Sequence, residues 1–200
     1  MSITTKKPGA VLPPALAAVI GRAATTLPPT TGATQQAAAR AARGDLRVVL
    51  ADVSSSMAEN AGALRKIDVL RQALSTLPPS VDVVAFSWQA VDVPHGAALP
   101  PPAGSTALHA ALNHVAARQP THVLVVSDGH PDNPRAALDA AARLSCQIDV
   151  IYCGPDGDRE GAAFMRRLAR GGGRVHRHSF RAAPEQLSRA VRSLALPVPK

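Results

Sequence analysis

Oxygen-bearing side chains stand directly after an apolar run in the stretch LRVVLADVSSSM, residues 46–57. The run ends in the carboxylate of Asp52, and the hydroxyls of Ser54, Ser55 and Ser56 follow it. In an extended turn, alternate side chains point the same way, so Asp52, Ser54 and Ser56 can converge on one point while Ser55 faces elsewhere. The spacing therefore predicts a group of oxygen ligands at the end of a strand.

Two further oxygen donors lie far from this loop in the sequence. Thr106 stands in PPPAGSTALHAAL, where a loop leads into a predicted helix, and Asp128 ends a second apolar run, VLVVSDG. Functional groups collect beyond the carboxyl ends of parallel strands, so we expect both residues to lie near the first group. The predicted site consists of Asp52, Ser54, Ser56, Thr106 and Asp128.

Carboxylates and hydroxyls without a soft ligand form an all-oxygen shell, which suits a hard cation. Mg²⁺ is the expected ion, because it prefers near-octahedral oxygen coordination at about 2.1 Å, and Mn²⁺ or Ca²⁺ are possible substitutes. Since the hydroxyls are neutral, a doubly charged ion held by two carboxylates keeps affinity for one more anion. The site is therefore predicted to accept an acidic group from outside the chain.

A helix cap is another interpretation of DVSSSM, because Ser and Asp at a strand-to-helix junction satisfy free backbone amides. That interpretation explains the loop but not Thr106 or Asp128. The metal interpretation covers all the predicted site residues, and a capping role for Ser56 is compatible with it.

From Leu46 onward the sequence alternates short apolar runs with helical patterns. The runs at 46–52, 81–87, 122–127 and 148–152 are continuously apolar, as is typical of parallel strands covered by helices on both faces. Residues 90–93 follow the second run too closely for a crossover helix and predict an antiparallel edge strand. We predict an α/β fold with a doubly wound, Rossmann-like, mostly parallel sheet of about six strands.

The helix expected between the first two strands has apolar residues at three- and four-residue spacing, which predicts one stripe packed on the sheet. The stripe consists of Leu64, Ile67, Leu70, Leu74 and Leu77. Its predicted polar face carries Arg65, Lys66 and Arg71.

Composition divides the chain into two parts. Residues 1–44 are rich in Ala, Pro and Thr and predict an N-terminal extension or linker, whereas residues 45–196 predict one folded domain. With 200 residues and 46% apolar composition, the chain is long enough to close a sizeable core.

The dispersed site residues resemble the metal-ion-dependent adhesion site of the von Willebrand factor A (vWA) domain family. In that family a D-x-S-x-S loop is followed by a distant Thr and then a distant Asp, and residues 52–56, Thr106 and Asp128 match in the same order. The middle position of the loop, commonly Gly in the family, is Ser55 here. The resemblance covers residues 45 to about 195.

This resemblance implies that Ser54 and Ser56 bind the metal directly and that Asp52 and Asp128 reach it mainly through water. Thr106 would bind directly in a high-affinity arrangement and through water otherwise. The family's activity implies a non-enzymatic protein-interaction module, in which Mg²⁺ accepts an Asp or Glu carboxylate of a partner protein. Similar domains in bacterial cytosolic proteins work beside AAA+ ATPases, so such an assembly is one expected setting.

A Mg²⁺-dependent phosphoryl-transfer or hydrolytic enzyme with Asp52 as nucleophile is the alternative. A haloacid-dehalogenase-like pattern requires a second Asp where this chain has Ser54, and no Lys or Arg adjoins the cluster in sequence. A GxSxG motif is also absent, so a serine-hydrolase site has no support.

The chain is basic, with 22 Lys and Arg against 14 Asp and Glu and a net charge of +8, which favours acidic partners. The composition argues against nucleic acid as a partner, because aromatic residues make up only 2% and the basic residues are scattered. We interpret Trp88 as an edge packing residue, without excluding a binding contact. His176 and His178 are interpreted as surface or packing residues, since no metal-ligand cluster accompanies them.

Cys146 and Cys153 form no CxxC pair and predict reduced core residues, hence a cytoplasmic protein. A signal peptide is the alternative, because Lys6 and Lys7 precede an apolar segment, but consecutive prolines at 13–14 break that segment. No apolar run reaches the length that crosses a membrane.

Overall fold

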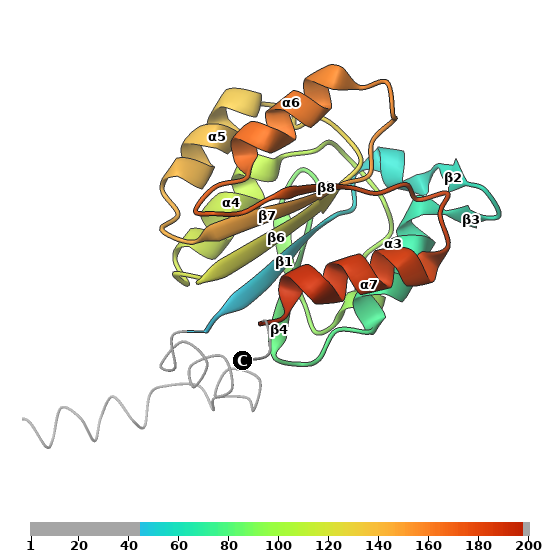
Figure 1. The fold of residues 1–200 in the computed structure, drawn as a ribbon, viewed down its shortest axis with the longest axis horizontal. Helices are drawn as coiled ribbons and strands as arrows, with labels where there is room; N and C mark the ends of the chain where they lie inside the picture. Colours follow the sequence, from blue (N-terminus) through green and yellow to red (C-terminus); the bar gives the residue numbers. More distant parts are fainter. Residues whose placement is uncertain (1–44, 198–200) are drawn as a thin grey trace, which may run out of the picture. The chain divides into compact units, whose positions relative to one another are not determined.

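The computed structural model describes residues 45–197, so the predicted extension 1–44 lies outside the described residues. Within the described range, strands and helices alternate around one main sheet (Figure 1). The strands of this sheet are β1 (Arg47–Asp52), β4 (Val81–Phe86), β5 (Ala90–Val93), β6 (His122–Ser127), β7 (Gln147–Tyr152) and β8 (Val175–Arg177).

The sheet has the spatial order β5-β4-β1-β6-β7-β8. Neighbouring strands pair in parallel, except that β5 runs antiparallel to β4 at the edge. The chain first builds outward from β1 through β4 and β5, then returns to the other side of β1 with β6. Strand order therefore reverses between β1 and β6, and the predicted mostly parallel sheet with one antiparallel edge strand is confirmed.

Helices cover both faces of the sheet, as predicted (Figure 1). One face carries α4 (Leu108–Ala116), α5 (Pro134–Ala142) and α6 (Arg159–Leu168), and the other carries α3 (Lys66–Ser75) and α7 (Pro184–Ala195). The central strands therefore bury both rows of side chains, which is why their sequences are apolar without alternation.

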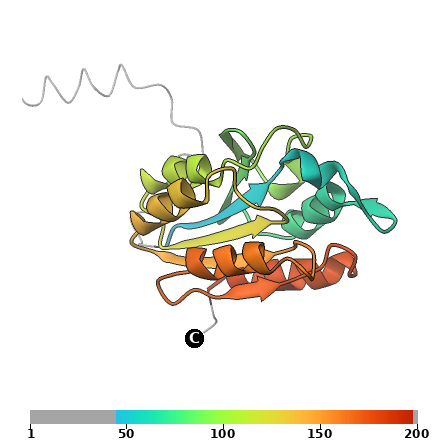
Figure 2. The same cartoon turned by 90° about the horizontal axis from the view of Figure 1, so that it is seen from above.

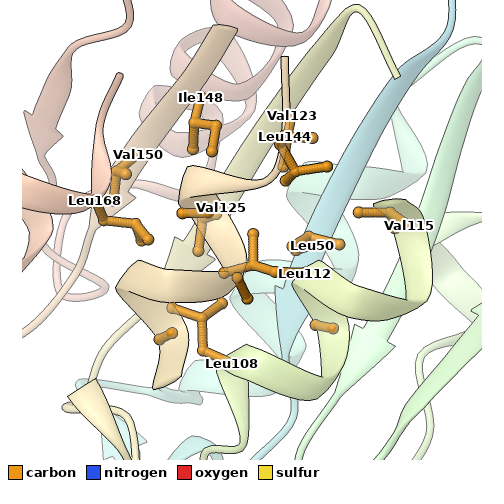
Figure 3. Packing of buried hydrophobic residues seen from close by; sticks show 14 of the residues in the cluster. Leu50, Leu108, Leu112, Val115, Val123, Val125, Leu144, Ile148, Val150 and Leu168 are labelled. Carbon is orange, nitrogen blue, oxygen red and sulfur yellow. The ribbon is translucent and has the colours of Figure 1, made fainter. Parts of the chain in front are cut away.

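The core on the α4, α5 and α6 side shows this packing directly (Figure 3). Leu50 of β1, Val125 of β6 and Leu112 of α4 are all 0% exposed and belong to one cluster. The adjacent residues Val49 and Ala51 point to the opposite core, against α3 and α7. Each central strand thus holds the two helical layers together.

The first long helix begins later than predicted, and the prediction for Leu64 is wrong. Leu64 lies in β3 (Leu64–Arg65), which pairs antiparallel with β2 (Asn60–Ala61), and its side chain is 42% exposed. Gly62 has a φ of +85° at the turn, which glycine adopts without steric cost, so the chain reverses here. Figure 2 shows the resulting β2–β3 hairpin projecting from the end of the sheet.

The rest of the predicted stripe is confirmed. Ile67, Leu70 and Leu74 are at most 1% exposed in α3, and Leu77 packs beside the same cluster. The cysteine prediction also holds, because Cys146 and Cys153 are buried and unbonded. Among residues 45–197, no helix is both long and apolar enough to cross a membrane.

We expect Leu50→Ala to lower the free energy of unfolding by about 2–5 kcal/mol, because it removes a fully buried side chain and leaves a cavity between β1 and α4. The matched control is Val91→Ala on the edge strand β5, where the side chain is 45% exposed and the change should stay within about 0.5 kcal/mol. Urea denaturation measures both. Equal effects of the two substitutions would contradict the packing described.

Candidate metal-ion site at the carboxyl end of the sheet

Asp52 is the last residue of β1, at the point where strand order reverses, and it is 0% exposed. Both carboxylate oxygens are engaged: Oδ1 accepts a hydrogen bond from the backbone N–H of Ser54 at 2.8 Å, and Oδ2 accepts one from Ser127 Oγ at 2.5 Å. Ser127 ends the neighbouring strand β6. These two bonds tie the loop after β1 to the end of β6.

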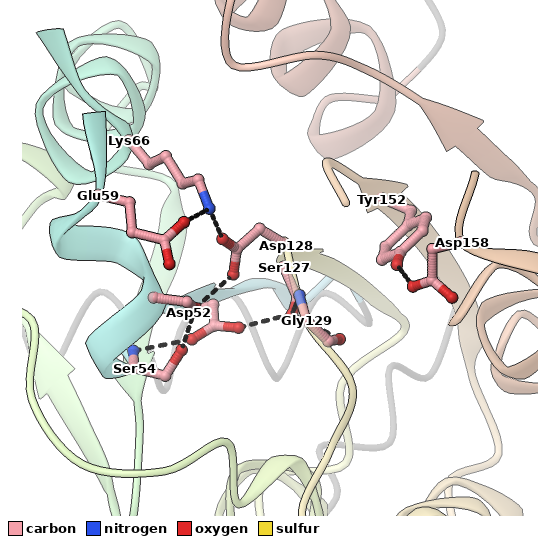
Figure 4. Close-up of polar contacts among 10 residues, drawn as sticks. Asp52, Ser54, Glu59, Lys66, Ser127, Asp128, Gly129, Tyr152 and Asp158 are labelled. Atoms are coloured by element: carbon pink, nitrogen blue, oxygen red, sulfur yellow. Dashed lines mark hydrogen bonds and ion pairs between the residues drawn. The ribbon is translucent and has the colours of Figure 1, made fainter. Parts of the chain in front are cut away.

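The serine hydroxyls extend this connection to Asp128 (Figure 4). Ser54 Oγ lies 3.1 Å from Ser56 Oγ, and Ser56 Oγ donates a hydrogen bond of 2.8 Å to Asp128 Oδ1. The structure thus brings together four of the predicted site residues. We call Asp52, Ser54, Ser56 and Asp128 the oxygen cluster.

Ser55 faces away from the oxygen cluster, as its place in the motif predicts. Its hydroxyl and its backbone N–H both donate to the carbonyl of Gly104, at 2.9 and 3.0 Å. Among the described non-glycine residues only Gln119 has a positive φ, so the backbone at Ser55 is not strained. The short 3₁₀ helix η1 (Ser55–Ala58) follows, and the Ser54 side chain does not cap it, although Asp52 accepts from the Ser54 backbone N–H just before it.

Thr106 lies on the adjacent loop but does not join the oxygen cluster through hydrogen bonds of the described residues. That loop contacts the serine loop through Gly104 and through the bond from Ala103 N–H to the Val53 carbonyl at 2.9 Å. The backbone of Thr106 is held by Asp132, whose Oδ1 accepts from Thr106 N–H at 2.9 Å and whose N–H donates to the Thr106 carbonyl at 3.0 Å. Asp132 therefore fixes the backbone of Thr106, on a loop that contacts the serine loop through Ala103 and Gly104.

Lys66 is part of this region, although the sequence pattern placed it on a polar helix face. Its ammonium donates to Asp128 Oδ2 at 2.5 Å and to Glu59 Oε2 at 2.7 Å (Figure 4). The side chain is 19% exposed, and that of Asp128 only 1%. No local signal identifies this contact, because Lys66 stands 62 residues before Asp128.

Burial controls the electrostatics of the cluster. It raises the pKa of Asp52 to about 6, although hydrogen bonds from Ser127 and Ser54 act in the opposite direction, and the charge of Asp128 adds to the rise. For Lys66, burial lowers the pKa, but the hydrogen bonds to Asp128 and Glu59 outweigh it, so the pKa lies above the usual value. Two carboxylates in a buried site therefore favour a nearby positive charge.

A second polar group holds the loop that follows Asp128. His130 Nε2 lies 2.7 Å from Asp158 Oδ2, and the Tyr152 hydroxyl donates to the same oxygen (Figure 4). Asp158 also caps α6 by accepting from Gly161 N–H at 2.9 Å. The Tyr152 hydrogen bond, followed by those from Gly161 and His130, lowers the pKa of Asp158 to about 2. Charge and hydrogen bonding thus anchor this loop to the start of α6.

Trp88 stands in the turn between β4 and β5 and is 70% exposed, so it is not buried at the sheet edge. Its indole ring lies against Gly104. A Cβ atom on residue 104 would lie 3.3 Å from the ring. Gly104 also accepts the two hydrogen bonds from Ser55. An exposed aromatic ring therefore flanks the loop that carries the oxygen cluster.

The donor set fits a hard divalent cation such as Mg²⁺ and gives no support to a soft metal. The oxygen cluster contains two carboxylates and two hydroxyls, and neither a thiol nor an imidazole belongs to it. The Lys66 ammonium pairs with Asp128 in this structure. His176 in β8 and His178 directly after it are both half-buried.

We expect Asp52→Asn to stabilise the metal-free protein above pH 6, because the amide oxygen can accept from Ser54 N–H and the amide nitrogen can donate to Ser127 Oγ without a buried charge. The wild-type carboxylate has a folded-state pKa near 6 and an unfolded value of 3.8, so its penalty is absent below pH 4 and complete above pH 6, at about 2–3 kcal/mol. Thermal unfolding in chelator at pH 4 to 8 measures the difference. A gain that does not depend on pH would contradict this burial effect.

Sequence and structure comparisons give different results. No protein-family model matches the sequence, and no curated protein sequence matches it either. The structure is similar to the von Willebrand factor type A protein from Catenulispora acidiphila, with a TM-score of 0.55 and 18% identity over 76% of this chain and 42% of that one. It is also similar to proximal thread matrix protein 1 from the mussel byssus, with a TM-score of 0.50 and 16% identity over 75% of this chain and 46% of that one.

This chain therefore matches less than half the length of either protein, and the likeness concerns the fold. The described residues have a vWA-like fold.

Proposed function

We propose that this chain is a protein-interaction module in which a Mg²⁺ ion binds an acidic residue of a partner protein. The observation that carries the proposal is the hydrogen-bonded convergence of Asp52, Ser54, Ser56 and Asp128 at the reversal point of a vWA-like sheet. Thr106 would complete the set from the adjacent loop. The bound ion would supply an open coordination position for an Asp or Glu carboxylate.

The burial of the donors indicates where a partner would approach. Asp52, Ser54 and Asp128 are at most 5% exposed, whereas Ser56 and Thr106 are partly exposed. The carboxylates would hold the ion from the buried side of the site. The partner would reach the ion from the solvent side, next to Ser56 and Thr106. Because the hydroxyl donors are neutral, the ion would retain positive charge for the incoming carboxylate.

The surroundings of the site suit an acidic protein partner. The net charge of +8 would speed the approach of an acidic surface, an effect that salt screens. Trp88 is exposed beside the serine loop and is the type of side chain that contributes strongly to protein interfaces. We place the module in the cytoplasm, beside an AAA+ ATPase, as a proposal that follows from the family resemblance; Mn²⁺ or Ca²⁺ would substitute for Mg²⁺.

The structure supports the enzyme alternative at one residue and opposes it at another. Lys66 supplies a cation beside Asp128, which the sequence pattern lacks. Asp52, however, is 0% exposed and uses both oxygens as hydrogen-bond acceptors, so it is poorly placed to attack a substrate. We therefore propose a binding function without catalysis; Mg²⁺-dependent hydrolysis of a phosphate ester that is lost in Asp52→Asn would overturn it.

We expect Ser54→Ala and Ser56→Ala each to weaken Mg²⁺ or Mn²⁺ binding by about tenfold or more, because each removes an oxygen that faces the site. The matched control is Ser55→Ala in the same loop, whose hydroxyl bonds to Gly104 instead and whose loss should change the affinity by less than about threefold. Isothermal titration calorimetry measures all three. If Ser55→Ala weakens binding as much as the other two, the ion is not held as proposed.

Binding of a partner carboxylate to the ion has a separate test. We expect a Glu-containing peptide to displace water from Mn²⁺ bound to the protein, seen as reduced water-proton relaxation, while the matching Gln peptide leaves relaxation unchanged. Neutral amides are weaker ligands of hard cations than carboxylates, which gives the expected difference. Equal effects of both peptides would argue against acidic-residue recognition.

A further inference from the structure

The Lys66 ammonium and a divalent ion would use the same carboxylate. Asp128 Oδ1 accepts from Ser56 Oγ at 2.8 Å, and Oδ2 accepts from Lys66 Nζ at 2.5 Å, so both oxygens already have partners. The Asp128 side chain is 1% exposed, which leaves little solvent to weaken the pairing. A metal ion that recruits Asp128 must therefore compete with Lys66.

The position of Lys66 results from the β2–β3 hairpin. The pairing of Asn60 with Arg65 closes the hairpin, and Lys66 N–H then donates to the Glu59 carbonyl at 3.0 Å. Glu59 and Lys66 are thereby neighbours at the base of the hairpin, where α3 begins. The ammonium is held against Asp128 by this local structure rather than by chance contact of a surface side chain.

We propose that Lys66 is an intramolecular competitor of the divalent ion, which occupies Asp128 in the metal-free protein and moves to Glu59 alone when the ion binds. This inference rests on the proposed metal site. The ion would bind only above the concentration at which it displaces the ammonium. Lys66 therefore sets the affinity of the site and, through it, the conditions under which a partner can bind.

Glu59 provides the place to which the ammonium moves. Its Oε2 already lies 2.7 Å from Lys66 Nζ, and its side chain is 66% exposed and free to follow. Both residues line a cavity of about 390 Å³, which gives the ammonium room away from Asp128. The displaced charge would thus keep one carboxylate partner instead of entering solvent unpaired.

The charges of the region allow both cations at once. Asp52, Asp128 and Glu59 carry three negative charges when ionised, and Lys66 carries one positive charge, which leaves two negative charges for a divalent ion to neutralise. Without Glu59, the ion and the ammonium would face only two carboxylates. Because of Glu59, the ion can displace the Lys66 ammonium from Asp128. Without Glu59, the ammonium would stay on Asp128 and keep the ion out.

Lys66→Met tests the competition, because it keeps most of the side-chain volume and removes the charge. We expect Mn²⁺ affinity to rise by about tenfold to a hundredfold, the range expected for losing a competing hydrogen bond between charged groups. The matched control is Arg65→Met, which removes the same charge one residue away, where the guanidinium pairs with Asp68 instead. Its affinity should stay within about threefold of wild type, because exposed pairs contribute little.

Glu59→Gln provides the opposite test in a chain that keeps Lys66. We expect weaker Mn²⁺ binding, because the displaced ammonium then has no carboxylate to receive it. Thermal unfolding gives a second measurement that does not depend on any partner: without metal, Lys66→Met should unfold at a lower temperature than wild type, and Mg²⁺ should raise its unfolding temperature by more than it raises that of wild type.

The outcomes separate the inference from the proposed function. If wild type binds Mn²⁺ and Lys66→Met binds it equally or more weakly, the competition is overturned and the metal site stands. If Lys66→Met does not fold, unchanged affinity in Glu59→Gln overturns the competition in the same way. If neither wild type nor any variant binds a divalent ion at millimolar concentrations, the metal site itself is overturned, and the inference fails with it.

Discussion

Two buried carboxylates at one end of the sheet, Asp52 and Asp128, impose the constraint on which this region depends. A carboxylate removed from water is costly unless hydrogen bonds or an opposite charge compensate it. Asp52 receives hydrogen bonds only, and its raised pKa shows that these do not fully compensate burial. Asp128 receives a hydroxyl and an ammonium. The Ser54 amide, two serine hydroxyls and the Lys66 ammonium provide this compensation.

The strand order explains why the two carboxylates meet. After β1 the chain forms β4 and β5 on one side of it and then returns to form β6 on the other side. The carboxyl ends of β1 and β6 are therefore adjacent, and the loops that follow them lead to opposite sides. Ser127 at the end of β6 bonds to Asp52 at the end of β1, and the serine loop bonds back to Asp128. An interaction site at this position thus needs few residues of its own, since the sheet brings its components together.

Most of the predicted architecture follows from short-range patterns. The continuously apolar strands, the antiparallel edge strand and the stripe of Ile67, Leu70 and Leu74 are all confirmed. The error at Leu64 arose because helical spacing continued through a residue that the chain uses in a hairpin. A two-residue strand carries too little periodic signal to compete with a helical pattern, and Gly62 was the available sign of the turn.

The sequence by itself determined the fold class and the candidate ligands, because apolar periodicity and the D-x-S-x-S spacing are properties of neighbouring residues. It also predicted that Asp128 would meet the serine loop, which follows from the rule that parallel strands end at one edge. Only the tertiary structure decided that Lys66 and Glu59 enter the region, and that Thr106 is held through its backbone. Those contacts depend on how a hairpin and two loops pack against each other, and no spacing along the chain encodes a side-chain direction across 62 residues.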